Sequence, residues 1–322
     1  MNDRRAREAI ESSDTDELLR IVDAGCVAQE WGELAKLRVL LREAIERGRQ
    51  LWGVDQHIRY RMALEGPADI AASAVEEGPA RFALGPLTEV AANRHTFAQL
   101  APHLHSSGNL GAVAAERAAA GERFSASGLP ANELPLKLEP WEPVYSLPVY
   151  HKDRVESPAP RRPRMQPVEL PEGARIIEDL ASTEALLALV LPWMEESNGR
   201  GQAVCVDGPP AAALRALSVP RAEIAPVSVA EAMAQMAWAA ASGGAMGRRR
   251  GAAYGRFATW FAMAVLAGWE WSASSQEMDD AASRLQWFSW NDLAPELGWS
   301  LHVGAHDAVE GLSWAIGARD AY

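Results

Sequence analysis

Cysteine and long apolar runs are both scarce in this 322-residue chain, and each shortage excludes a class of protein. Cys26 and Cys205 are the two cysteines, so nothing demands the oxidising compartment of disulfide-rich domains. The longest apolar run, residues 257–269, is too short to span a bilayer. The N-terminus also lacks the apolar core of a secretory signal. We therefore expect a soluble cytoplasmic protein that does not enter a membrane.

Lysine is scarce as well, and the net charge is strongly negative. Only three of the 31 cationic side chains are lysines, and the formal net charge is −12. Residues 1–150 carry 16 cationic and 22 acidic side chains, residues 151–170 carry 5 and 3, and residues 171–322 carry 10 and 18. Because no segment forms a basic domain, nucleic acid is an unfavoured partner.

Motifs of nucleophilic and cofactor-dependent enzymes are missing too. The chain has no G-x-S-x-G nucleophile elbow and no G-x-G-x-x-G loop after a strand. Cys205 lies in an apolar strand pattern, where a thiol is usually inert. His302 and His306 share one face of an expected strand beside Asp307, but no third ligand position is evident. We therefore assign no catalytic residue, no cofactor and no metal.

Residues 1–125 have the pattern of a helical domain. Apolar residues recur at helical spacing, and Gly25 and Gly48 suit the ends of two such helices. The tetrapeptide EGPA occurs at 65–68 and again at 77–80, where its proline suits the first turn of a helix. Short successive helices are typical of a solenoid-like array or of an irregular bundle, and both interpretations stay open.

A proline-rich stretch at 126–172 separates this domain from residues 173–322. Proline fixes φ and removes a backbone donor, so the stretch is expected to be an extended connector. We expect residues 151–168 to lack regular structure and to be the preferred site of proteolysis.

Residues 173–322 mix helical and strand patterns. Aromatic and branched residues predict strands at 202–208, 284–290 and 298–306. Ser228 and Glu231 have the spacing of a capping box before a helix, and the acidic start of residues 307–322 predicts a final helix. The predicted fold class is therefore mixed, with an all-α N-terminal domain and an α+β C-terminal domain that contains a small antiparallel sheet.

The stretch SGGAMGRRRGAAYGRF at 242–257 combines regularly spaced glycines with four of the ten cationic side chains of residues 171–322. Its glycines recur every fourth residue, and we expect a loop at 243–247 before a helix from about 248 to 267. On such a helix the glycines would share a face that another backbone can approach. The candidate anion-binding residues are Gly247, Arg248, Arg249, Arg250 and Arg256.

Two arrangements of these arginines are possible. Free N–H groups at a helix N-terminus, together with guanidinium groups, would hold a phosphate or a carboxylate. Alternatively, the arginines pair with the many acidic side chains of this domain, which is the arrangement we favour. In either case Arg249 and Arg256 are seven residues apart and are expected to project together from one helix.

Tryptophans gather late in the chain, with nine of the twelve at or beyond Trp193. Trp287, Trp290 and Trp299 flank an expected turn, and we expect one or two of these rings to be exposed. Because tryptophan is enriched at interaction surfaces, these three are candidates for binding a protein partner.

Three stretches resemble a family of uncharacterised actinobacterial proteins. They are ASGGAMGRRRGAAYGRFATW at 241–260, GWSLHVGAHDAVEGLSWAIGARDAY at 298–322 and, in the connector, EPWEPVYSLPVYHKDRVESPAP at 139–160. The resemblance covers roughly the last half of the chain, and it implies no activity and no functional residue.

The sequence leaves two hypotheses for function. The first is a non-enzymatic cytoplasmic binding or regulatory protein that acts through protein–protein contacts. The second is an enzyme or sensor that binds a phosphorylated or other anionic small molecule through the cluster from Arg248 to Arg256.

Overall fold

The computed structural model describes residues 3–129, 133–295 and 298–321 and divides the chain into two compact units. Unit 1 comprises residues 1–117, 124–131 and 148–156, and unit 2 comprises residues 118–123, 132–147 and 157–322. The chain therefore passes between the units several times.

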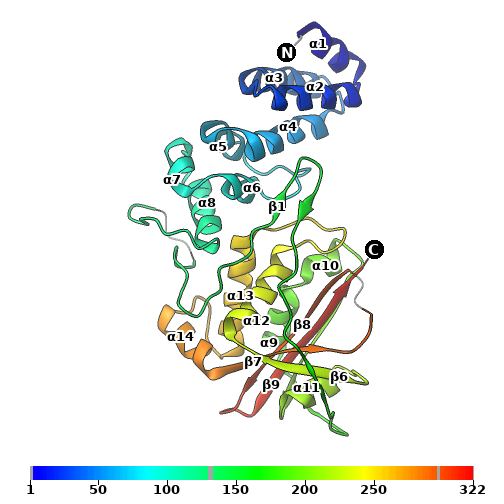
Figure 1. Cartoon of the computed structure of the whole chain (residues 1–322), viewed down its shortest axis with the longest axis vertical. Coiled ribbons are helices and arrows are strands. Elements are labelled where there is room, and N and C mark those ends of the chain that lie inside the picture. The colour runs from blue at the N-terminus through cyan, green and yellow to red at the C-terminus, as the bar shows by residue number, and fades with distance from the viewer. Residues whose placement is uncertain (1–2, 130–132, 296–297, 322) are drawn as a thin grey trace. The chain divides into compact units, whose positions relative to one another are not determined.

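Unit 1 is built from short helices (Figure 1). They are α1 (Asp3–Ser12), α2 (Thr15–Val27), α3 (Trp31–Glu46), α4 (Trp52–Glu65), α5 (Ala68–Glu76), α6 (Leu87–Arg94), α7 (Phe97–Leu100), a 3-10 turn (Ala101–His103) and α8 (Ser107–Ala119), which belongs to unit 1 up to Arg117. Leu34, Leu37 and Leu41 follow the helical period on α3 and are fully buried. The predicted helical character of this region is confirmed, whereas a regular repeat stays a prediction.

Part of the proline-rich stretch belongs to unit 1 as a two-stranded hairpin, β1 (Val149–Tyr150) and β2 (Val155–Glu156). The Tyr150 hydroxyl donates to Glu89 of α6 at 2.5 Å, and the Tyr60 hydroxyl of α4 donates to the carbonyl of His151. The hairpin is therefore fixed to the helices by one buried and one partly buried hydrogen bond.

Unit 2 contains a seven-stranded antiparallel sheet in the order β3-β6-β7-β8-β9-β5-β4 (Figure 1). Its strands are β3 (Gln166–Val168), β4 (Arg175–Ile177), β5 (Arg200–Asp207), β6 (Ala222–Val227), β7 (Leu285–Asn291), β8 (Trp299–Asp307) and β9 (Leu312–Asp320). Its helices are α9 (Leu180–Ala188), α10 (Leu191–Glu195), α11 (Pro210–Ala216), α12 (Val229–Ala241), α13 (Ala252–Leu266) and α14 (Ser275–Arg284). The predicted α+β class is confirmed, with a larger sheet than expected.

The two faces of the sheet are covered unequally. One face carries the main core, in which Val303 of β8 and Ile316 of β9 pack against helices that include α9, α12 and α13. On the other face, Val206 of β5 and Ala315 of β9 pack against α11 alone among these helices. Because α11 is short, it covers only part of this second face.

The prediction of a C-terminal helix was wrong, because residues 312–320 form the strand β9. Asp307 accepts hydrogen bonds from the backbone N–H groups of Val309 and Glu310 at 2.9 and 3.3 Å, and Gly311 has a φ of +70°. Asp307 therefore caps a turn between β8 and β9. An Asp side chain can accept hydrogen bonds from backbone N–H groups in a turn as well as at a helix start.

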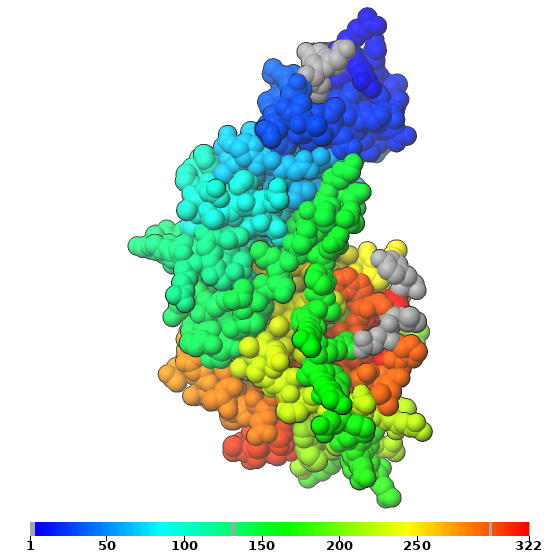
Figure 2. Space-filling view, in the orientation of Figure 1, coloured from blue at the N-terminus to red at the C-terminus, as the bar shows by residue number. Residues whose placement is uncertain are grey.

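The expectation that residues 151–168 lack regular structure was also wrong. Besides the hairpin, β3 pairs with β6 at the edge of the sheet. Two residues of the segment between β2 and β3 are also anchored. The carbonyl of Ser157 accepts a hydrogen bond from Trp238 at 3.0 Å, and Arg162 donates to the Ser300 hydroxyl at 2.6 Å. Figure 2 shows the green stretch that follows residue 157 as a band over the surface of unit 2. Proline removed backbone donors here, and side chains supplied the missing anchors.

Candidate functional site

The glycine and arginine stretch forms a loop, and its arginine triplet precedes the helix. Helix α13 begins at Ala252 with Gly251 as its N-cap at a φ of +105°, so Arg248, Arg249 and Arg250 lie outside it. The expectation that Arg249 and Arg256 project from one helix was therefore wrong. Of the four regularly spaced glycines, only Gly255 lies inside α13. The other three, Gly243, Gly247 and Gly251, lie in turns that a side chain would obstruct or strain.

The N–H groups of this loop bind the protein's own side chains. The Ala245 N–H donates to the buried carboxylate of Asp320 at 2.6 Å, and the Met246 N–H donates to the Ser197 hydroxyl at 3.2 Å. The Arg248 N–H donates to Glu196 at 3.3 Å. Gly247 lies so close to Gly243 that an added Cβ would meet its carbonyl oxygen at 2.1 Å. Internal carboxylates thus occupy the place we predicted for an anion.

The arginine side chains of the stretch have internal partners as well. Arg256 is 2% exposed and forms two hydrogen bonds of 2.7 Å with Glu142, so this guanidinium is neutralised inside unit 2. Arg250 pairs with Glu196, and Arg249 donates to the Ser157 hydroxyl at 3.1 Å. The cavity beside Arg249 holds about 20 Å³, which is room for a water molecule but not for an organic ligand.

The tryptophan candidates are mostly buried. Trp287 and Trp290 are 3% and 2% exposed, so neither of these two rings is available to a partner at the surface. Trp299 is half-buried and stacks on Trp238 at a centroid distance of 4.8 Å. The rings of Trp287 and Trp290 are buried because β7 is an interior strand of the sheet, between β6 and β8.

The two histidines of β8 share a face, as their spacing predicts, but they have different environments. His306 Nδ1 lies 2.9 Å from the Ser313 hydroxyl and 3.0 Å from the Leu312 carbonyl. His302 stacks on Trp290 at 4.4 Å. Within the described residues, no group of three or more His, Cys, Asp or Glu side chains has the arrangement of a metal site.

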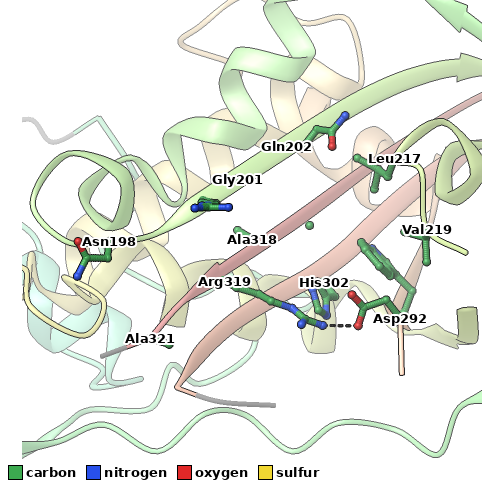
Figure 3. Close-up of a pocket in the computed structure, with 13 residues that line it drawn as sticks. Asn198, Gly201, Gln202, Leu217, Val219, Asp292, His302, Ala318, Arg319 and Ala321 are labelled. Carbon is green, nitrogen blue, oxygen red and sulfur yellow. Dashed lines mark hydrogen bonds and ion pairs between the residues drawn. The ribbon is translucent and has the colours of Figure 1, made fainter. Parts of the chain in front are cut away.

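The candidate site is a cavity on the second face of the sheet, beyond the end of α11 (Figure 3). We name it the sheet-face pocket. It encloses about 530 Å³, which is the size of a typical small-molecule site. Its lining residues are Asn198, Arg200, Gly201, Gln202, Leu217, Val219, Trp290, Asp292, His302, Gly317, Ala318, Arg319 and Ala321.

Strand register places two arginines side by side at one end of the pocket. Arg200 of β5 is directly opposite Arg319 of β9, and directly opposed residues have Cβ atoms about 5 Å apart. Arg319 forms an ion pair with Asp292, as the dashed line in Figure 3 shows. Nearby, burial and the charge of Arg319 lower the pKa of Arg162. This end of the pocket therefore has a positive potential that one carboxylate balances only in part.

The middle of the pocket is uncharged and aromatic. Gln202, Gly317 and His302 form one row across β5, β9 and β8, and a Cβ at Gly317 would come within 2.9 Å of the Trp290 ring. His302 is 4% exposed, and its buried Nδ1 has no hydrogen-bond partner among the described residues. Burial, reinforced by Arg319, lowers the pKa of His302 to about 4, so the imidazole is neutral at pH 7.

Sequence reasoning missed the pocket for a specific reason. Arg200 and Arg319 lie far apart in the sequence, and only the pairing of β5 with β9 brings them together. Because residues 312–320 were expected to be a helix, that pairing was invisible. The alternation of Ser313, Ala315, Gly317 and Arg319 with larger apolar residues was the signal that would have revealed a strand.

Comparison with known proteins identifies a family without giving it a function. Residues 16–300 match a family described as a family of unknown function (DUF6183), and the chain belongs to this family. No curated protein and no solved structure matches the chain significantly. In the described part of the chain, no helix combines the length and the apolar character that crossing a membrane requires.

Proposed function

We propose that this protein is a non-enzymatic binding protein that takes up a small organic anion in the sheet-face pocket. The observation that carries the proposal is the direct pairing of Arg200 with Arg319 at one end of a cavity of about 530 Å³. Arginine guanidinium groups are the preferred partners of carboxylates and phosphates in proteins.

The other ionisable groups of the pocket support binding rather than chemistry. Asp292 is held by Arg319, and His302 is neutral and stacked under Trp290. The pocket combines a few polar groups with apolar walls, as binding sites for small molecules do.

This proposal keeps the anionic ligand that the sequence suggested but moves its site. Arg256 and Arg250 are paired with Glu142 and Glu196, so the stretch from Arg248 to Arg256 does not favour a ligand. The alternative of a protein partner loses the support of Trp287 and Trp290, because both rings are buried.

The proposal also includes the setting in which the protein acts. From the resemblance in the sequence we infer that the family occurs in actinobacteria. The two buried, unpaired cysteines are compatible with a reducing cytoplasm.

Thermal unfolding in the presence of organic carboxylates and organic phosphates tests the binding. A ligand at one hundred times its Kd stabilises by about 2.7 kcal/mol, which raises the Tm of a domain of this size by roughly 5–10 °C. We expect this shift in the wild type and its loss in Arg200→Gln and Arg319→Gln.

The matched control is Arg175→Gln, because Arg175 is an exposed arginine of β4 outside the pocket. Arg175→Gln should retain the full increase in Tm on addition of the ligand. Equal shifts in the wild type and in both pocket variants would contradict the proposed site.

A further inference from the structure

The sheet-face pocket has a polarity gradient that runs along the strands. Arg200 and Arg319 define its cationic end, and two residues further along the same strands Gln202 and Gly317 face the cavity. Leu217 and Val219, which follow α11, line the opposite end (Figure 3). A bound molecule therefore meets charge at one end and hydrocarbon at the other.

The cationic end has room for one planar anionic group. Asp292 already engages the guanidinium of Arg319, whereas the side chain of Arg200 has no partner among the described residues. A single guanidinium fork matches the two oxygens of a carboxylate, and the neighbouring arginine adds positive potential.

The middle and far ends of the pocket favour an uncharged and largely apolar body. The Trp290 ring covers Gly317, so the floor there is flat and aromatic. His302 is buried and stacked on that ring, with no partner for its Nδ1 among the described residues, and Leu217 and Val219 present only hydrocarbon. A second charge on the ligand at this depth would lose its hydration without gaining an ionic partner.

We infer that the ligand is an amphipathic organic carboxylate, with its carboxylate at Arg200 and Arg319 and its apolar group extending toward Leu217 and Val219. This inference rests on the proposed anion-binding function and adds the class and the orientation of the ligand.

Calorimetric titration of the full chain with three small probes tests the inference. The first probe, 3-phenylpropanoate, has both a carboxylate and an apolar group. Acetate lacks the apolar group, and 3-phenylpropan-1-ol lacks the charge. We expect 3-phenylpropanoate to bind at least about tenfold more tightly than either of the others, because each feature contributes separately.

Two variants test the orientation. Val219→Thr keeps the shape of the side chain but replaces a methyl group by a hydroxyl at the apolar end, so it should weaken the binding of 3-phenylpropanoate severalfold and leave that of acetate unchanged. Arg200→Gln should weaken both carboxylates and leave the alcohol unchanged. Arg175→Gln is the control that should change none of the three.

The outcomes separate this inference from the function on which it rests. If acetate or organic phosphates bind through Arg200 and Arg319 as tightly as 3-phenylpropanoate does, anion binding stands and the amphipathic ligand is wrong. If the alcohol binds as tightly as the carboxylate, the orientation is wrong. If no anion binds the wild type, both the function and the inference are wrong.

Discussion

At the scale of single residues, the buried pair of Arg256 and Glu142 joins two distant segments of unit 2. Both side chains are almost fully buried, and Arg256 also donates to the carbonyls of Pro135 and Lys137 at 2.7 and 2.9 Å. The Tyr145 hydroxyl donates to the same carboxylate at 2.9 Å. One guanidinium thus fastens a segment of the proline-rich stretch to α13.

Replacing Arg256 by Met should therefore lower the free energy of unfolding by about 3–5 kcal/mol, because Glu142 would remain as a buried, uncompensated charge. Urea denaturation measures this change. The double variant R256M/E142M should recover part of the loss.

The control for this prediction is the exposed pair of Arg250 and Glu196, where Arg250→Met should cost no more than about 1 kcal/mol. Equal losses in the two single variants would show that burial does not decide the strength of these pairs.

His302 makes a residue-scale prediction about pH. Burial and then Arg319 lower its pKa to about 4, whereas an unfolded histidine titrates near 6.5. Between these values the unfolded state binds more protons, so the contribution to stability is complete above about pH 6.5 and is lost as the pH falls toward 4.

The expected loss of unfolding free energy from the protonation of His302 is roughly 3 kcal/mol. Denaturation of the wild type and of His302→Gln at pH 7 and pH 4.5 isolates it, because other groups titrate equally in both proteins. The variant should lose less stability on acidification. His103→Gln, at an exposed position, should behave like the wild type, and an identical pH dependence for His302→Gln would refute the assignment.

At the scale of elements, the pairing of α12 with α13 depends on Gly255. A Cβ at this position would lie 2.3 Å from the carbonyl oxygen of Ala237 and 3.0 Å from the Cβ of Ala241, so the helices touch through their backbones. Gly255→Ala should therefore destabilise unit 2 by about 1–3 kcal/mol, despite the better helix propensity of alanine.

Gly32→Ala is the matched control for this prediction, because Gly32 lies in α3 with nothing within 4 Å of an added Cβ. It should be neutral or stabilise by up to about 1 kcal/mol. Thermal unfolding measures both variants, and a stabilised Gly255→Ala would show that the two helices can separate without cost.

Elements with local signals were predictable, and elements that depend on neighbours were not. The capping box of Ser228 and Glu231 begins α12 as its spacing predicts, since both hydrogen bonds lie within one turn. By contrast, the short edge strand β3 forms because β6 pairs with it, and Pro167 in its middle argued against any strand.

At the scale of the whole molecule, the units are not consecutive in sequence, and this determines which fragments fold. Residues 132–147 belong to unit 2 and supply Glu142 to Arg256 and Trp141 to Asp279, with a hydrogen bond of 2.6 Å in the latter contact. A fragment that begins at residue 157 lacks both contacts.

We expect the fragment 118–322 to unfold cooperatively and the fragment 157–322 to have a Tm lower by roughly 10 °C or more, because Arg256 would be buried without its partner. Circular dichroism on heating compares the two. Equal Tm values would mean that residues 118–156 contribute nothing to unit 2.

Local periodicity and capping encode the fold class, the helical character of residues 1–125 and three strands of unit 2, β5, β7 and β8, so these were fixed by the sequence alone. It also contained the acidic side chains that neutralise the arginine cluster, although not which of them do so. Only the tertiary structure decided that Arg256 meets Glu142, that Trp290 is buried and that Arg200 lies beside Arg319. These outcomes depend on strand order and register, which arise from contacts between distant segments and leave no periodic trace in the chain.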